Sequence, residues 1–221
     1  MKVNEVYKIY RTPKILQEHM LRTAALANII IRKWVGVNVD KDSIIKTCAI
    51  HDIAKPMNFD LVKQAQFGMS EKDIGKLKQL QKKLKTKYGD DEHRASALIA
   101  KDLGCNSNVI KFVNNLEWEY LPRLFKANDL DSLISIYCDM RIGPEGILTL
   151  QERLEELKKR TGRTNYQENG ARLETLITEN VTLDLNQISN EQLNQKFENL
   201  LNLEILLWNH TKTKEVPDII Y

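Results

Sequence analysis

An imidazole, a carboxylate and an ammonium group lie close together in the segment Ala49-Ile-His-Asp-Ile-Ala-Lys-Pro56. Two further candidates, His19 upstream and Asp139 downstream, occur on strongly apolar helical patterns. Imidazole and carboxylate ligands together suit divalent manganese, iron, cobalt, nickel or zinc. An unpaired carboxylate on an apolar helix is costly, and a metal ion is a suitable partner for it. The sequence therefore predicts a metal site built from His19, His51, Asp52 and Asp139.

Three predicted helices must position these side chains. Thr12-Pro13 opens the first helix, with the threonine as N-cap and the proline in the first turn. Asp40 caps a second helix, which Pro56 ends, so that the His-Asp pair lies near its C-terminal end. Residues 129–141 form the third helix. Because the ligands are distant in sequence, only a packed helical bundle can bring them together.

Cap residues and apolar spacing predict helices along most of the remaining chain. Ser70 begins a lysine-rich helix that ends at Tyr88-Gly89, and residues 60–90 are expected to form an exposed insertion. Residues 181–185 come nearest to a strand, but they are too few to be convincing. The sequence thus predicts an all-α bundle of nine or ten helices. The other expected helices span 92–103, 107–120, 149–160 and 189–208.

Composition restricts the classes of function. The 221 residues suit a single domain, and the net charge is only +3, without a basic tail or block, so binding to long nucleic acid is not expected. The start of the chain lacks the apolar core of a signal peptide, and no apolar run is long enough for a membrane span. We therefore expect a cytoplasmic protein with no membrane partner. Three widely spaced cysteines, expected to be reduced core residues, are Cys48, Cys105 and Cys138.

The order of these motifs, His, then His-Asp, then Asp, resembles the HD superfamily of metal-dependent phosphohydrolases. The resemblance covers residues 12–142, and all four ligand positions match. It implies a single domain, residues 1–221, in which an HD-type metal-binding core at 12–142 carries a packed helical extension at 143–221. It also implies hydrolysis of a phosphate ester of a small nucleotide or related metabolite by a metal-activated water.

The resemblance also suggests how the cations of the site act. In the pattern His-Asp-x-x-Lys, the lysine of the family contacts the phosphate or the leaving oxygen, which assigns that role to Lys55, with Asp52 as its catalytic partner on the metal. Arg22 lies three residues after His19 and shares its helix face. Arg94 and Arg141 are weaker candidates for binding the substrate phosphate.

A second metal position is also predicted. Many HD proteins carry two further histidines between the His-Asp pair and the last aspartate. Here His93 matches the first, whereas Glu117 stands where the second would be. Glutamate can bind the same metals, so the sequence leaves one ion or two ions open.

Two other functions compete with hydrolysis. Some HD proteins resemble di-iron oxygenases, which need six ligands for two irons, and others are ligand sensors without catalysis. The segment 143–221 resembles the run after the last aspartate in a subset of small HD proteins and names no substrate. Its leucines and Trp208 could close the bundle or form a dimer face, and His210 is expected to be exposed. The leucines are Leu200, Leu201, Leu203, Leu206 and Leu207.

Overall fold

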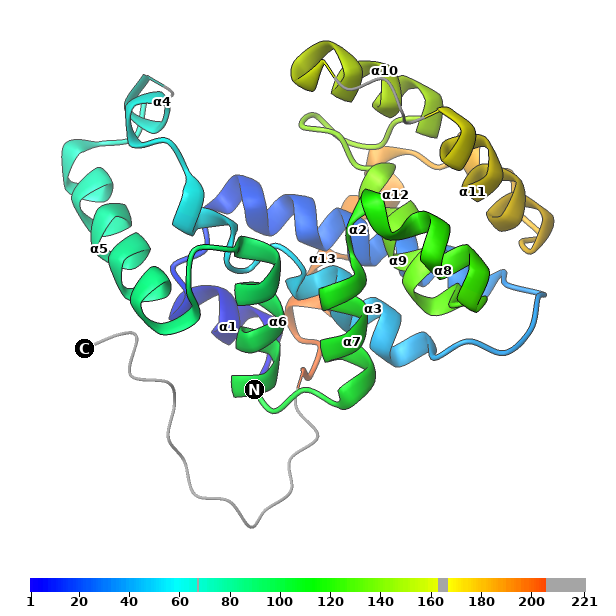
Figure 1. The fold of residues 1–221 in the computed structure, drawn as a ribbon, viewed down its shortest axis with the longest axis horizontal. Helices are drawn as coiled ribbons and strands as arrows, with labels where there is room; N and C mark the ends of the chain where they lie inside the picture. The colour runs from blue at the N-terminus through cyan, green and yellow to red at the C-terminus, as the bar shows by residue number, and fades with distance from the viewer. Residues whose placement is uncertain (67, 163–166, 206–221) are drawn as a thin grey trace.

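The computed structural model describes residues 1–66, 68–162 and 167–205 (Figure 1). Helices dominate these ranges, and the only β-type pairings found there are isolated bridges, including one between Trp34 and Val181. The all-α prediction is confirmed, and the segment 181–185 contributes only that bridge. Across the same ranges, no helix has the length and apolar character of a membrane span.

The centre of the bundle consists of α2 (Lys14–Arg32), α3 (Lys41–Ile50) and α9 (Leu130–Met140), each of which packs against the other two. The alanines Ala24, Ala25 and Ala27 of α2 are completely buried. Small side chains let a neighbouring helix approach closely, so α2 can bury almost its whole middle section. Residues 132–138 of α9 are also all buried, as expected for a helix that is apolar on most sides.

Around this centre lie several shorter helices. A short α1 (Val3–Ile9) precedes α2, while α6 (Glu92–Asp102) and α7 (Ser107–Asn115) pack against each other. The helix predicted over 107–120 is divided: α7 ends at Asn115, and η2 (Trp118–Tyr120) and α8 (Leu121–Ala127) follow. The side-chain amide of the buried Asn115 donates a hydrogen bond to Ser132 and accepts one from Arg123, and these bonds stabilise the interruption of the helix after Asn115.

The predicted caps at Asp40 and Ser70 are confirmed, because each side chain accepts a hydrogen bond from the first turn of its helix. Side chains cap other helices in the same way at Asp91, Asn106, Asp129, Thr149 and Ser189. The N-cap predicted at Thr12 is wrong, because Pro13 occupies the cap of α2 and the buried Thr12 hydroxyl has no partner among the described residues.

The insertion forms one end of the molecule (Figure 1). It contains α4 (Leu61–Gln66) and α5 (Glu71–Tyr88), and η1 (Lys55–Asn58) leads into it. The apolar stripe of α5, Leu77, Leu80 and Leu84, is buried. The Gln81 amide donates to the carbonyl groups of Pro56 and Phe59, at 3.0 and 2.8 Å, and so ties α5 to the turn after the His-Asp motif.

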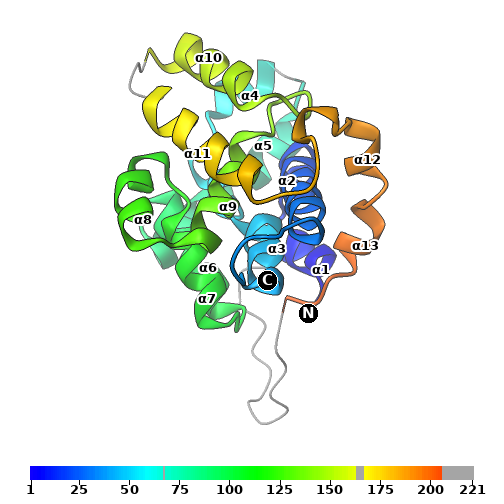
Figure 2. The ribbon, with the colours of Figure 1, turned by 90° about the vertical axis from the view of Figure 1, so that its right-hand side faces the viewer.

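The C-terminal extension covers the other side of the bundle. It begins with α10 (Leu150–Thr161) and α11 (Gln167–Glu179) and continues through η3 (Leu185–Gln187) to α12 (Asn190–Asn194) and α13 (Phe197–Leu201). Figure 2 shows α12 and α13 alongside α2, which they contact. The extension thus packs on the helix that carries His19.

The single long helix predicted over 189–208 is wrong for its described part. The helix is interrupted between α12 and α13, and the backbone after α13 pairs with the N-terminus. The amide of Val3 donates to the carbonyl of Leu203, and the amide of Ile205 donates to the carbonyl of Met1. This pairing requires extended backbone and ends the helix. Leu206, Leu207, Trp208 and His210 lie outside the described residues, so the dimer face stays a prediction.

Candidate metal centre

Three of the four predicted ligands converge at the centre of the bundle. The Nε2 atom of His19 lies 2.9 Å from Oδ1 of Asp139, and Nε2 of His51 lies 3.1 Å from the same oxygen. One ligand atom from each of the three residues falls within 4.8 Å of the other two. Side chains separated by up to 120 positions in sequence therefore meet around a single point.

Asp52 borders this group. Its Oδ2 lies 3.6 Å from Nε2 of His51 and 3.8 Å from Nε2 of His19. The same oxygen accepts a hydrogen bond of 2.6 Å from Nζ of Lys55. The motif thus supplies a carboxylate that faces both imidazoles on one side and a cation on the other.

The backbone at the end of α3 fixes the orientation of His51. Because a carbonyl oxygen can only accept, Nδ1–H of His51 donates to the carbonyl of Cys48 at 2.9 Å, which points Nε2 toward Asp139. One residue after Cys48, the carbonyl of Ala49 accepts from the buried Tyr7 hydroxyl at 2.7 Å. A hydrogen bond on the remote ring nitrogen is the usual way in which a metal-binding histidine is oriented. Nothing in the sequence indicates this role for the Cys48 carbonyl.

The donor set and its spacing fit a divalent metal ion. Ligand atoms at about 2.0–2.2 Å from a metal, in tetrahedral or octahedral arrangement, lie roughly 3.0–3.5 Å from each other. The two Asp139 contacts of 2.9 and 3.1 Å agree with that spacing, and those of Asp52 are slightly wider. Two imidazole nitrogens and two carboxylates would neutralise a divalent charge in a site with little water.

Mutual electrostatic effects keep the group charged. Burial lowers the pKa of His51, but the charges of Asp52 and Asp139 outweigh it and raise the pKa to about 9. Burial likewise raises the pKa of Asp139, yet His51 and His19 hold it well below its ordinary value. A metal ion must therefore displace a proton from His51 at neutral pH, as is general for histidine ligands.

One side of the group is open to solvent. The His51 side chain is 2% exposed and that of Asp52 9%, whereas Asp139 and Lys55 are 27% and 43% exposed. Burial lowers the pKa of Lys55, but Asp52 and Asp139 raise it above its usual value overall, so the ammonium stays charged. A small anion could therefore reach the cation and the carboxylate edge from the solvent.

Glu92 at the start of α6 also belongs to this edge, although its sequence position does not predict this role. Its charge contributes to the raised pKa of Lys55, and its carboxylate accepts from the Asn58 amide at 3.1 Å. An acidic residue in the first turn of a helix is common for reasons of the helix dipole alone, so no sequence signal distinguished this one.

The predicted phosphate-binding role of Arg141 is wrong. Its side chain is 1% exposed, and its guanidinium donates to the carbonyl groups of Leu148 and Leu185 and to the Tyr137 hydroxyl. Every guanidinium nitrogen is thus used inside the protein. Arg141 instead joins the end of α9 to the C-terminal extension.

The other two arginines predicted to bind phosphate, Arg22 and Arg94, have no recorded contact with the candidate metal ligands. Arg22 lies between Glu18, at 3.6 Å, and Asn194, at 3.3 Å, with its guanidinium over the ring of Phe197. It holds α12 and α13 against α2. Arg94 is exposed on α6, and the structure records no contact between it and the ligands. Phosphate binding by either arginine stays a prediction.

Neither predicted ligand of a second metal joins a metal-binding group among the described residues. His93 is half-buried in the first turn of α6, and Glu117 is half-buried at the start of η2. The group of His19, His51 and Asp139 includes neither residue. The second ion therefore stays a prediction without geometric support.

All three cysteines are free and buried, as predicted. Burial raises the pKa of Cys105 to about 12 and that of Cys48 well above its usual value. Thiols of this kind are poor nucleophiles.

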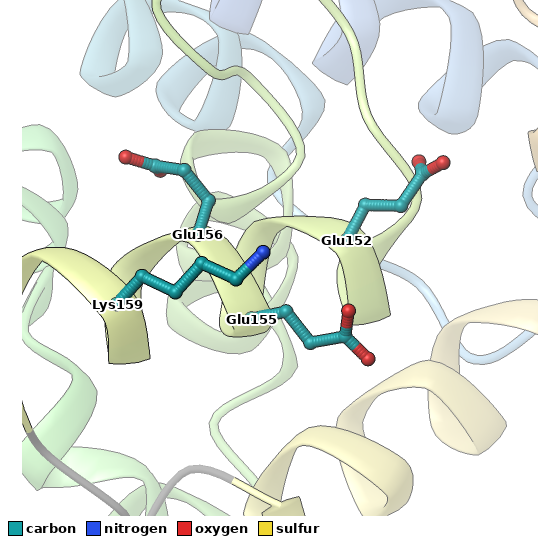
Figure 3. A pocket seen from close by; sticks show the side chains of 4 residues that line it. All are labelled: Glu152, Glu155, Glu156 and Lys159. Atoms are coloured by element: carbon teal, nitrogen blue, oxygen red, sulfur yellow. The ribbon is translucent and has the colours of Figure 1, made fainter.

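A surface hollow lies along α10 and is lined by Glu152, Glu155, Glu156 and Lys159. Figure 3 shows that the three carboxylates point in different directions along the helix. None of the predicted site residues lines this hollow. It offers no set of converging polar groups, and the histidine–aspartate group is the stronger candidate for a functional site.

Comparisons with known proteins add no assignment. No protein-family model matches the chain, and no curated protein or solved structure shows significant similarity to it.

Proposed function

We propose that this protein is a metal-dependent phosphohydrolase that cleaves a phosphate ester of a small nucleotide or a related metabolite. The observation that supports the proposal most strongly is the convergence of His19, His51 and Asp139 from three different helices. A structural role for these side chains alone would not require two imidazoles to share one carboxylate oxygen.

The metal would be held by His19, His51 and Asp139, with Asp52 as the fourth ligand. A divalent ion bound there would supply Lewis-acid activation of water and would neutralise charge on the phosphate. Manganese, iron, cobalt, nickel and zinc all accept this mixed nitrogen and oxygen set. One ion is sufficient for this chemistry, and the geometry favours one.

Lys55 gives the site its selectivity for an anion. Its ammonium is held beside Asp52 and is partly exposed, so a phosphoryl oxygen arriving from solvent would meet a fixed positive charge. Charge builds on the phosphoryl oxygens in the transition state, and a preplaced cation stabilises it there. When a substrate replaced Asp52 as the partner of Lys55, one carboxylate oxygen of Asp52 would be released from its hydrogen bond. Substrate binding would therefore be coupled to this change at Asp52.

The other enzyme class considered, a di-iron oxygenase, needs further ligands that the group does not contain. A ligand sensor would not need the complete set of four ligand side chains. We also propose that the protein acts in the cytoplasm, as expected from the sequence.

The test combines metal analysis with an activity screen. Protein purified without chelators, together with its Asp52→Ala and His51→Ala variants, is analysed for bound metals by elemental analysis. The three proteins are then assayed for phosphate release from a panel of nucleotides with added manganese, cobalt or iron. We expect about one ion per wild-type chain and phosphate release from at least one nucleotide, with both lost in the variants.

Two results would contradict the proposal. Unchanged metal content in both variants would show that the metal is bound elsewhere. Full metal occupancy without phosphate release from any nucleotide would leave the metal site in place but remove the assigned reaction. An Asp102→Ala variant, which alters an acidic residue outside the group, controls for nonspecific effects of charge.

A further inference from the structure

Positive charge is concentrated on one helix, although the chain as a whole is nearly neutral. Helix α5 carries seven lysines and two acidic residues, Glu71 and Asp73, both in its first turn. This helix therefore has a larger positive charge than the whole chain, whose net charge is +3. The overall balance that argued against nucleic-acid binding hides this local excess.

The lysines form two rows along the exposed side of α5. With about 100° of rotation per residue, the buried stripe of Leu77, Leu80 and Leu84 occupies one side of the helix. The rows flank a solvent-facing strip made of Gly75, Gln79 and Thr86, all three of which are exposed. One row contains Lys72, Lys76, Lys83 and Lys87, and the other contains Lys78, Lys82 and Lys85.

Several of these charges are exposed and weakly held or unpaired. Lys76 pairs with Asp73 at 2.8 Å and Lys87 pairs with Asp102 at 2.9 Å, and both lysine side chains are more than 40% exposed. Exposed pairs of this kind contribute little to stability and exchange readily for other anions. Lys78, Lys82 and Lys85 form no ion pair in the part of the chain that the structure describes.

Gly75 provides an independent indication that something approaches this helix. Glycine inside a helix costs about 1 kcal/mol relative to alanine. A Cβ atom added at Gly75 would meet no atom within 4 Å, so the fold gives no steric reason for glycine there. A small residue between two rows of cations is useful when a ligand must come close to the helix backbone.

We propose that α5 binds duplex DNA in the major groove, without reading its sequence. The groove is about 12 Å wide and admits one α-helix, with a phosphate backbone on each side. Two lysine rows separated by a small, uncharged strip match that arrangement, because each row would face one backbone while the strip faces the groove floor. The helix is about 27 Å long, which gives contacts over several phosphates on each strand.

The same features argue against the other polyanions. The deep, narrow major groove of an RNA duplex does not admit side chains in this way. Single strands are usually bound by exposed aromatic residues, and the exposed side of α5 carries none. Membrane binding by a surface helix needs an apolar face in the lipid, and that face of α5 is buried in the protein core.

The position of α5 leaves it accessible. Figure 1 shows it along the outer edge of the molecule, at the end opposite α10 and α11. Its attachment through Gln81 to Pro56 and Phe59 keeps the lysine rows facing outward. The proposal does not depend on the metal centre or on the proposed reaction.

The experiment measures binding of a fluorescein-labelled 20-base-pair duplex by fluorescence anisotropy at several salt concentrations. Each phosphate neutralised contributes about −0.9 to the slope of log affinity against log salt. We expect micromolar binding at low salt. In the triple variant Lys78→Gln, Lys82→Gln, Lys85→Gln, affinity should fall about tenfold or more, and the slope should become smaller by about 2.7.

A charge-matched control variant, Lys14→Gln, Lys126→Gln, Lys158→Gln, changes three exposed lysines on other helices and should bind like the wild type. Gly75→Leu keeps every charge but fills the strip, and should weaken duplex binding while circular dichroism remains unchanged. Because the metal centre is not involved, Asp139→Asn should bind the duplex normally. That variant separates failure of this proposal from failure of the proposed reaction.

Four outcomes would overturn the proposal. The first is no binding by the wild type at low salt, and the second is an equal loss in the control and in the α5 triple variant, which would indicate net charge alone. The third is equal or tighter binding of a single strand or an RNA duplex. The fourth is binding to vesicles of anionic lipid at salt concentrations at which the DNA duplex is not bound.

Discussion

The metal centre and helix α5 both concentrate charge, but they do so in opposite ways. At the centre, groups of opposite sign from α2, α3 and α9 meet within 4.8 Å and are largely buried. On α5, groups of one sign spread along the exposed length of a single helix. The first arrangement suits the capture of one small, highly charged ion, and the second suits an extended polyanion. The difference shows that the net charge of the chain predicts neither the metal centre nor the lysine rows of α5.

The comparison predicts that the two regions respond differently to the loss of a charge. The largest effect is expected for Asp139→Asn, which keeps the shape of the side chain but removes the carboxylate shared by His19 and His51. Metal content and phosphate release should fall to background, as measured by elemental analysis and a phosphate assay. An unchanged metal content would show that this carboxylate is not a ligand.

The second prediction concerns the connection between the core and its extension. Arg141→Met removes the donors to two carbonyl groups and one hydroxyl that are buried around it. Because unsatisfied buried groups cost about 1–3 kcal/mol each, the free energy of unfolding should fall by about 3 kcal/mol or more. Urea unfolding measures this loss. If Arg141 bound substrate instead, stability would be retained and KM would rise.

A smaller but more specific effect is expected for Lys55→Gln. The ammonium beside Asp52 should act on the substrate, so kcat should fall about 10²-fold, the scale for removal of one charge-stabilising donor, while metal content stays the same. Lys82→Gln on α5 makes the same chemical change in the other region and should leave kcat unaltered. Equal rates for the two variants would remove the assigned role of Lys55, and Arg22 would be examined next.

The sequence predicted those features that depend on local chemistry. The caps at Asp40 and Ser70 were predictable because a side chain satisfies the backbone only two or three residues away. The helical positions of His19 and Asp139 followed from apolar spacing in the same way, whereas His51 directly follows α3 as its C-cap. Their convergence was expected from the cost of an unpaired carboxylate on an apolar helix and from the resemblance of the motif order, since spacing along the chain does not fix how helices pack.

Other features depend on distant partners and were missed for that reason. Arg141 looks like a surface cation in sequence, but Leu148, Leu185 and Tyr137 bury it. The amphipathic pattern after Ser189 favours one helix, yet pairing with Val3 and Met1 ends the helix early. A tertiary contact also explains why residue 146 is glycine, because the Asn190 side chain lies where a Cβ atom would be. The local sequence does not reveal this contact.

The last prediction concerns α5 and compares the glycine inside it, Gly75, with the glycine that follows its last residue, Gly89. A Cβ added at Gly75 or at Gly89 would meet no other atom within 4 Å, so sterically the two substitutions are alike. They differ in backbone conformation: Gly75 lies inside the helix, whereas Gly89 ends it with φ of 85° and ψ of −168°. Gly75→Ala should therefore raise the free energy of unfolding by about 1 kcal/mol through helix propensity.

Gly89→Ala should lower that free energy by roughly 1–3 kcal/mol, because this region of backbone conformation is open almost only to glycine. Urea unfolding of both variants and the wild type gives the two changes directly, and neither should alter metal content. Suppose that Gly75→Ala stabilises the protein and leaves DNA binding intact, while Gly75→Leu weakens DNA binding. These results together would indicate that glycine is retained for access to the helix surface. If Gly75→Ala destabilised the protein, the fold would need glycine at this position, and Gly75 would no longer support a binding role for α5.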